Sequence, residues 1–189
     1  TWLLKKWLLN FKIIYRWNYN DEDDRIRGMF GYFDTINGGI QGRHKFPPHS
    51  LLHYLLTVYH NVKNADKFVQ LSLDKMYYSG LHDSLQGGFF RYCVDQNWVI
   101  PHFEKMLYDQ AMMLMNYSLA YKKYQKDIYK KAVNEIITCL DESFEIDGLY
   151  ASAYDADTNH HEGLTYIWTI EELKSCLNDK EFKIFTDHY

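Results

Sequence analysis

Apolar residues recur at helical spacing along most of the chain. The clearest stripes cover 51–62 and 128–140, where apolar positions three and four residues apart share one face of a helix. A stripe of methionines and tyrosines runs from Met106 to Tyr124, and we predict that its helix opens at Pro101, because proline is tolerated in the first turn. Weaker helical patterns cover 1–17, 21–34, 65–79, 170–177 and 179–187. The pattern therefore predicts about eight helices.

Three glycine-containing segments separate these helices: 37–48, 80–100 and 147–168. The last two alternate aromatic and polar residues around glycine, which favours short β-hairpins over a large sheet. Helix pairs joined alternately by short turns and long loops are typical of an array of helical hairpins, in which one end carries the functional site. The sequence thus predicts an all-α fold of the α/α-toroid class, and we expect the loops 80–100 and 147–168 to meet at one end of the stack.

The composition is that of one compact domain over residues 1–189, with 47% hydrophobic and 24% charged residues. A net charge of −4, without a basic block, argues against nucleic-acid binding. The three cysteines are widely spaced and indicate no disulfide framework or metal site, so a cytoplasmic setting is expected. Because Lys5, Lys6 and Lys12 interrupt the apolar start of the chain, we predict an amphipathic core helix there and no membrane segment. The sequence contains no cofactor motif.

Aromatic residues are unusually frequent, with 17 Tyr, 11 Phe and 5 Trp. Arg91, Asp95 and Trp98 follow the run Gly-Gly-Phe-Phe at 87–90 and combine ring faces with fixed polar groups. Such a combination is suited to sugars, whose C–H face stacks on a ring while their hydroxyls need polar partners. The alternative is that these rings only fill the space between helices.

The segment after Pro101 is a candidate for acid–base chemistry. In the predicted helix, His102 and Glu104 would occupy the first turn, where a histidine and a carboxylate could transfer protons. In the alternative interpretation Glu104 only stabilises the helix start, Lys105 and Asp109 form a surface pair, and His102 caps a buried loop.

An acidic cluster covers 155–162. Its spacing begins like a calcium loop, but His160 stands where such loops need glycine, so we exclude an EF-hand. Asp155 and Asp157 would share one face of an extended segment and could serve glycoside chemistry or bind sugar hydroxyls. Alternatively, the cluster is a solvated turn whose aspartates stabilise the backbone.

Three stretches resemble the signature blocks of one protein family. They are GGIQGRHKFPP over 38–48, LHDSLQGGFFRYCVDQNWVIPHFEKMLYDQA over 81–111 and GLYASAYDADTNHHEGLTYIWTIEEL over 148–173. Similar blocks, in the same order, are typical of the thioredoxin-domain-containing proteins of the spermatogenesis-associated protein 20 type.

This resemblance implies a helical barrel of the six-hairpin (α/α)6 kind, similar to N-acylglucosamine 2-epimerases and six-hairpin glycosidases. Members of the family typically carry an N-terminal thioredoxin-like domain and continue beyond the third block. We therefore expect this chain to comprise the first half of the barrel, without the thioredoxin-like domain.

Our hypothesis is a toroid domain that binds a carbohydrate or sugar-like ligand and, if catalytic, acts as an epimerase, isomerase or glycosidase. His102 would then be the general acid or base, with Glu104 or Asp157 as its partner. The remaining ligand-binding candidates are Lys45, Arg91, Asp95, Trp98, Asp109, Asp155 and Glu162. The rival hypothesis is a non-catalytic scaffold that serves a thioredoxin-like partner. Because half a barrel would leave apolar strips uncovered, among them Tyr117, Tyr121 and Tyr124, self-association is also expected.

Overall fold

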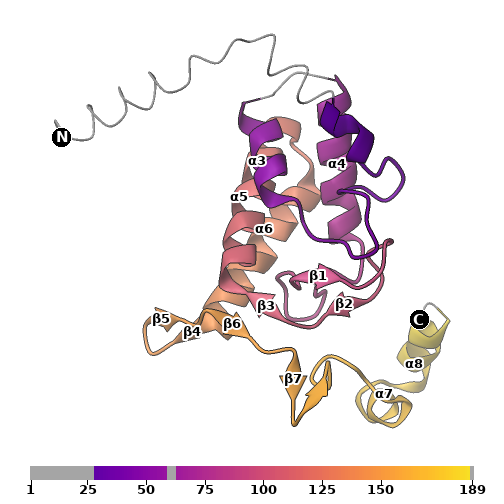
Figure 1. Ribbon diagram of the computed structural model, residues 1–189. Coiled ribbons are helices and arrows are strands. Elements are labelled where there is room, and N and C mark those ends of the chain that lie inside the picture. The colour runs from indigo at the N-terminus through magenta and orange to yellow at the C-terminus, as the bar shows by residue number, and fades with distance from the viewer. Residues whose placement is uncertain (1–27, 59–62, 188–189) are drawn as a thin grey trace.

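Two up-and-down helical hairpins form the body of the protein. The computed structural model describes residues 28–58 and 63–187. In Figure 1 the chain rises through α3, descends through α4, rises through α5 and descends through α6. These helices are α3 (His49–Thr57), α4 (Lys63–Tyr77), α5 (Leu107–Tyr124) and α6 (Asp127–Cys139). A short 3-10 helix, η1 (Phe30–Tyr32), precedes them, and a π-helical turn, η2 (Leu140–Phe144), extends α6.

Side-chain contacts are consistent with this alternation. The Tyr129 hydroxyl on α6 donates to Asp74 on α4, and further along both helices the Tyr77 hydroxyl donates to Glu135. The two contacts follow the same order along both helices, so α4 and α6 run in the same direction. The hairpin pattern predicted from the sequence is therefore confirmed.

The core lies between these helices and is rich in aromatic rings. Tyr117 on α5 is fully buried, stacks on Phe89 and donates its hydroxyl to the Leu73 carbonyl. Tyr121 and Tyr124 pack against the same cluster. For Tyr117, the expectation that another chain must cover it is wrong, because the chain's own helices bury it; Tyr121 and Tyr124 are partly buried.

Four antiparallel ribbons, each of two-residue strands, lie at one end of the described helices. They pair β1 (Tyr92–Cys93) with β2 (Pro101–His102), β3 (Lys105–Met106) with β6 (Ala153–Tyr154), β4 (Glu145–Ile146) with β5 (Leu149–Tyr150), and β7 (Asp157–Thr158) with β8 (His161–Glu162). The Phe90 ring in the second glycine-containing region meets the Tyr166 ring in the third, with centroids 5.0 Å apart, so the prediction that these loops meet is confirmed.

The prediction that a helix begins at Pro101 is wrong. Pro101 and His102 form β2, and the helix begins only at Leu107. Proline fits the start of a short edge strand because it has no N–H to leave unpaired. His102 and Glu104 therefore lie in an extended segment and not at a helix N-terminus.

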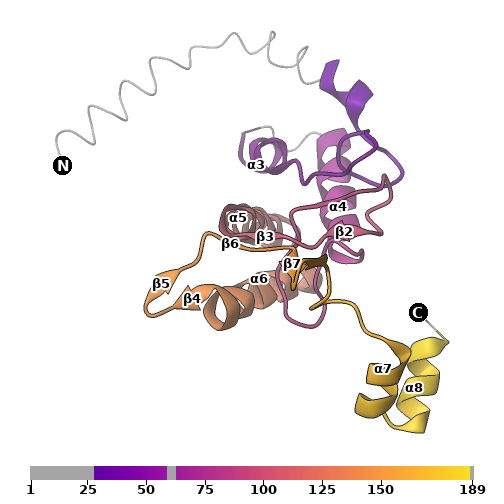
Figure 2. The ribbon, with the colours of Figure 1, turned by 60° about the horizontal axis from the view of Figure 1, so that its bottom comes forward.

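The chain ends in a small helix pair, α7 (Ile170–Cys176) and α8 (Asp179–Thr186), as the sequence pattern predicts. Both helices begin with a capping box, formed by Thr169 with Glu172 and by Asn178 with Glu181. Neither helix has a buried residue, and Figure 2 shows the pair apart from the helical body. The predicted helix over 1–17 and the first half of that over 21–34 lie outside the described residues.

Candidate functional site

Four charged side chains meet on one face of the ribbon end, and we call Arg91, His102, Glu104 and Glu162 the charged cluster. Arg91 Nη1 donates to Glu104 Oε2 at 2.8 Å. His102 lies between two carboxylates, with Nδ1 2.6 Å from Glu162 Oε1 and Nε2 3.8 Å from Glu104 Oε2. The cluster combines residues from the second and third glycine-containing regions.

The extended backbone explains why His102 and Glu104 share a face. Alternate residues of a strand point to opposite sides, so Phe103 and Lys105 face the other way. Backbone hydrogen bonds hold this arrangement, since Arg91 N–H donates to the Glu104 carbonyl at 2.8 Å and Tyr92 pairs with His102. His102 and Glu104 are therefore close together, as the sequence predicted, but an extended segment and not a helix brings them together.

Aromatic rings border the charged cluster. Tyr92 stacks on the His102 ring at 4.9 Å between centroids, and Phe46 stacks on Tyr92 at 4.4 Å. Phe46 is half exposed, so this stack presents an open ring face. Hydrogen bonds to Glu104 and Tyr108 raise the pKa of Arg91 and keep its guanidinium charged.

Lys45 lies outside the charged cluster and uses its ammonium group for hydrogen bonds within the protein. It is fully buried, and its Nζ donates to Asp34 at 2.7 Å, to the Gly38 carbonyl at 2.8 Å and to the Ile40 carbonyl at 2.9 Å. Since an ammonium group has three donors, none is left for a ligand. The prediction that Lys45 binds ligand is therefore wrong.

Asp95 and Trp98 stabilise a turn. The Asp95 carboxylate accepts backbone hydrogen bonds from Asn97, Val99 and Ile100. Burial alone would raise the pKa of Asp95, but these N–H groups lower it. Trp98 is fully buried and its indole N–H donates to the Asn37 carbonyl at 2.9 Å. The structure does not bring these two candidates into the charged cluster.

Asp109 is buried against the start of α3. Its Oδ1 lies 2.9 Å from His49 Nε2, and its Oδ2 has no hydrogen-bond partner. Lys105, the surface partner suggested in the alternative interpretation, is itself buried and donates to Asp83 at 2.7 Å. The pairing of Lys105 with Asp109 is therefore wrong. The partners Asp34, His49 and Asp83 carry no sequence motif that would have identified them.

Asp155 and Asp157 are both exposed. Asp155 accepts from the Asp157 N–H at 3.1 Å, as in the solvated turn considered above. Asp157 lies opposite Glu162 in the β7–β8 ribbon, which puts it next to the charged cluster. No group of three metal-binding side chains occurs within 28–58 and 63–187.

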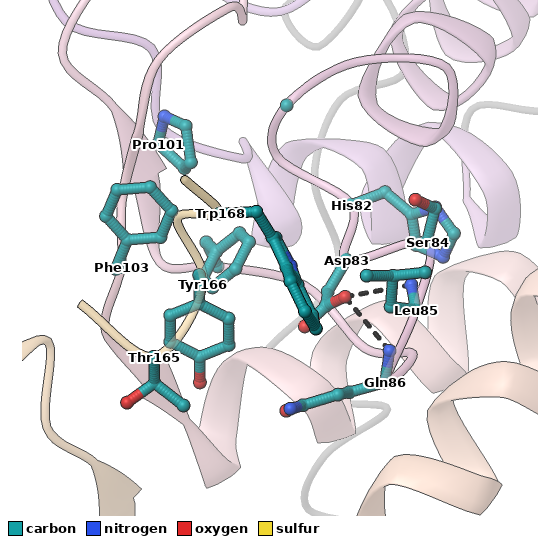
Figure 3. A pocket seen from close by; sticks show the side chains of 12 residues that line it. His82, Asp83, Ser84, Leu85, Gln86, Pro101, Phe103, Thr165, Tyr166 and Trp168 are labelled. Carbon is teal, nitrogen blue, oxygen red and sulfur yellow. Dashed lines mark hydrogen bonds between the residues drawn. The ribbon is translucent and has the colours of Figure 1, made fainter. Parts of the chain in front are cut away.

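A pocket of about 270 Å³ lies on the other side of the 101–105 segment, and we call it the aromatic pocket (Figure 3). Phe103, Tyr166 and Trp168 supply its rings, and His82 and Gln86 contribute polar groups. None of these five residues was predicted from the sequence to belong to a site. The strand alternation would have indicated Phe103, had the segment been read as extended.

The chain is similar in sequence to part of several longer animal proteins. An uncharacterised protein of Caenorhabditis elegans is 34% identical over 178 residues, which cover 83% of this chain and 24% of that protein. Spermatogenesis-associated protein 20 of Homo sapiens is 32% identical over 158 residues, and that of Mus musculus 32% over 161, each match covering 77% of this chain and 20% of the relative. The chain thus spans about a quarter or less of the length of these relatives. No family model matches the chain.

Two solved structures have the same fold. A sugar epimerase from a ruminal bacterium superposes with a TM-score of 0.61 at 16% identity, over 78% of this chain and 43% of that one. Cellobiose 2-epimerase from Spirochaeta thermophila superposes with a TM-score of 0.56 at 15% identity, over 69% of this chain and 36% of that one.

The helical hairpins and these superpositions define the fold as that of the α/α-barrel sugar epimerases. Within that fold, the chain belongs to the spermatogenesis-associated protein 20 family. The family and the all-α barrel class expected from the three signature blocks are confirmed. None of the helices in the described part of the chain is long and apolar enough to cross a membrane.

Proposed function

We propose that the charged cluster binds a sugar-like ligand and acts on it as an epimerase or isomerase. The observation that carries the proposal is the placement of His102 between the carboxylates of Glu162 and Glu104, with Arg91 beside them. The fold shared with two sugar epimerases supports the same reaction class.

The geometry gives His102 a defined role. With Nδ1–H donated to Glu162, the other ring nitrogen carries the lone pair and can accept a proton. Its side chain is one-quarter exposed, so a ligand can reach it. In an epimerisation, Nε2 would take the hydrogen from the carbon next to a sugar carbonyl, the electron pair of that C–H bond would form an enolate, and a proton would return to the opposite face. Glu104 or Asp157 would stabilise the charged imidazole or supply the second proton-transfer group.

The other residues would bind and orient the sugar. The exposed face of Phe46, stacked on Tyr92, suits the C–H face of a pyranose ring. Arg91 has five N–H donors and uses Nη1 for Glu104, so it can also hydrogen-bond sugar hydroxyls. Asp155 and Glu162, both exposed, are further acceptors for hydroxyl groups.

We also propose that the chain forms the first half of a larger barrel, which the partial coverage of both epimerases supports. A cytoplasmic location is consistent with three free cysteines, Cys93, Cys139 and Cys176. The alternative function is a non-catalytic binding domain that partners a thioredoxin-like protein. The direct Arg91–Glu104 ion pair favours it, because that pair uses part of the cluster internally.

The test is hydrogen exchange at sugar C2. The 189-residue chain is incubated in D₂O with cellobiose or N-acetylglucosamine, and the C2–H signal is followed by proton NMR. Binding is measured separately by thermal shift. We expect loss of the C2–H signal, slowed by roughly 10²-fold or more in His102→Gln. The matched control is His161→Gln, which changes a neighbouring exposed histidine and should exchange at the wild-type rate.

The exchange and binding measurements together distinguish the catalytic proposal from the non-catalytic alternative. Binding without exchange would favour the non-catalytic alternative. If neither sugar binds, or if His102→Gln exchanges as fast as His161→Gln, the proposed catalytic role is overturned.

A further inference from the structure

The aromatic pocket lies apart from the charged cluster and has a free ring face. Phe103 and Tyr166 stack on each other at 5.5 Å, and Phe90 meets both edge to face. Trp168 has no ring partner in the described part of the chain, and 48% of it is exposed. Figure 3 shows its indole between the Tyr166 side of the pocket and the turn at 83–86.

Polar groups that can both donate and accept hydrogen bonds line the same pocket. His82 has a side chain that is only 4% exposed, and its Nε2 lacks a hydrogen-bond partner although it lies 3.3 Å from Glu135 Oε2. Gln86 is exposed at the rim, and no hydrogen bond of its side-chain amide occurs in the described residues. Gln86 therefore offers a donor and an acceptor to a ligand in the pocket, whereas His82 Nε2 faces Glu135 and is not accessible from the pocket.

The walls of the pocket are electrically neutral overall. Its one carboxylate, Asp83, accepts from Lys105 at 2.7 Å. It also accepts from the backbone N–H groups of Leu85 and Gln86, and these two hydrogen bonds are drawn in Figure 3. Burial lowers the pKa of His82, so its imidazole is neutral near pH 7. A charged ligand would find no counter-charge, whereas hydroxyl groups would find partners.

We propose that the aromatic pocket is a second carbohydrate site, in which one neutral pyranose ring stacks on Trp168 and hydrogen-bonds to Gln86. The volume of about 270 Å³ is just below the range of roughly 300–1,000 Å³ typical for drug-sized ligands, which fits one ring and not an extended chain. The site is independent of the charged cluster, because Phe103 and His102 point to opposite sides of the same extended segment.

The probe is methyl β-D-glucopyranoside, with the galactoside and mannoside as epimers and glucose 6-phosphate as a charged analogue. Binding to the 189-residue chain is followed by the indole N–H resonance of Trp168, assigned from its loss in Trp168→Phe. We expect a saturable shift with at least one neutral glycoside and a weaker one with the phosphate.

Three variants report on the pocket through competition or calorimetry with the same glycoside. Trp168→Ala should weaken binding roughly tenfold, and Trp168→Phe should retain part of it, because phenylalanine keeps a stacking ring. Gln86→Ala should weaken binding without removing the ring. The matched control Tyr32→Ala removes another exposed aromatic side chain and should leave the affinity unchanged.

The proposal is overturned if no neutral glycoside shifts the Trp168 resonance, or if Trp168→Ala binds as tightly as Tyr32→Ala. Glu104→Gln should leave the shift in place. Loss of the shift in that variant would assign the binding to the charged cluster and would also overturn a separate site. Circular dichroism of each variant distinguishes lost binding from lost folding.

Discussion

Two buried lysines organise the loops at the residue scale. Lys45 and Lys105 are almost completely inaccessible, and each pairs with one aspartate; Lys45 also donates to two backbone carbonyl oxygens and Lys105 to one. Lys45 also lies over the Trp98 ring and Lys105 over the Phe90 ring, at 5.7 and 5.2 Å from the centroids. A buried charge is tolerated only when it is paired and hydrogen-bonded, so each lysine stabilises the conformation of the loop that supplies its partners.

Replacement of Lys45 should therefore be costly. Lys45→Met keeps the length of the side chain but leaves Asp34 and two backbone carbonyls without their donor. We expect a loss of about 3–5 kcal/mol in the free energy of unfolding, measured by urea titration. Lys130→Met, at an exposed position of α6, is the control and should change stability by less than about 0.5 kcal/mol. Equal effects would mean that the buried pair contributes no more than a surface charge.

Asp34, the partner of Lys45, should make the stability of the fold sensitive to acid. Burial alone would raise the pKa of Asp34, but hydrogen bonds from Asn37 and Lys45 lower it to about 2. A carboxyl with a lowered pKa stabilises the folded state above its unfolded pKa near 3.8, and this contribution is lost as the pH falls towards 2.

Thermal unfolding between pH 5 and pH 2.5 checks this expectation. The wild-type chain should lose more stability over that interval than Asp34→Asn, which has no carboxylate to protonate. Glu171→Gln removes an exposed carboxylate and should follow the wild-type curve. Parallel curves for Asp34→Asn and wild type would contradict the assignment.

At the scale of elements, a glycine pair lets the 80–90 loop contact α6. Gly87 and Gly88 both have positive φ, 75° and 76°, a conformation that side chains rarely adopt. A Cβ on Gly87 would collide with the Glu135 carbonyl oxygen, and one on Gly88 would lie 2.7 Å from Cys139 Sγ. The loop that carries His82 and Asp83 is thus held directly against the helix.

Gly87→Ala and Gly148→Ala separate backbone strain from steric collision. Gly148 has a similar φ of 80°, but nothing lies within 4 Å of its hypothetical Cβ. Both variants lose stability because alanine disfavours a positive φ, whereas only Gly87→Ala must also displace the α6 backbone. We expect Gly87→Ala to be less stable than Gly148→Ala by roughly 2 kcal/mol, measured by chemical denaturation. Similar losses would show that the loop can move away from α6 at little cost.

At the scale of the whole molecule, the α7–α8 pair exposes apolar side chains. Ile170 at the start of α7 and Ile167 just before this helix are each 58% exposed, and neither helix of the pair has a buried residue. Large apolar side chains gathered on a surface are typical of an interface. This surface is where a further part of a barrel, or a second copy of the chain, would pack.

Sedimentation over a range of concentrations tests self-association. We expect the 189-residue chain to associate reversibly, and Ile170→Ser to weaken association because it removes an exposed apolar contact. Glu171→Ser changes the adjacent exposed residue and should associate as the wild type does. A monomer at every concentration, or an Ile170→Ser variant that associates unchanged, would contradict this interface.

The sequence alone determined the helical hairpins and the position of the loops. Apolar spacing located α4 and α6 almost to their ends, and capping residues mark the starts of α7 and α8. Glycines marked the segments that form short ribbons. These features depend on neighbouring residues, because helical periodicity and positive φ are properties of a local stretch of chain. The proximity of His102 to Glu104 was likewise predicted from the sequence, whereas Glu162 was expected only as a ligand-binding residue and not as the partner of His102.

Only the tertiary structure decided the conformation of the segment after Pro101 and which of the charged candidates belong to a site. Residues 101–106 are extended because Tyr92–Cys93 and Ala153–Tyr154, distant in sequence, supply their hydrogen-bonding partners. Lys45 is structural because the carbonyls of its own loop and the Asp34 carboxylate surround it. Such outcomes depend on which distant segments meet, and a local pattern of polar and apolar residues carries no information about the partner across the contact.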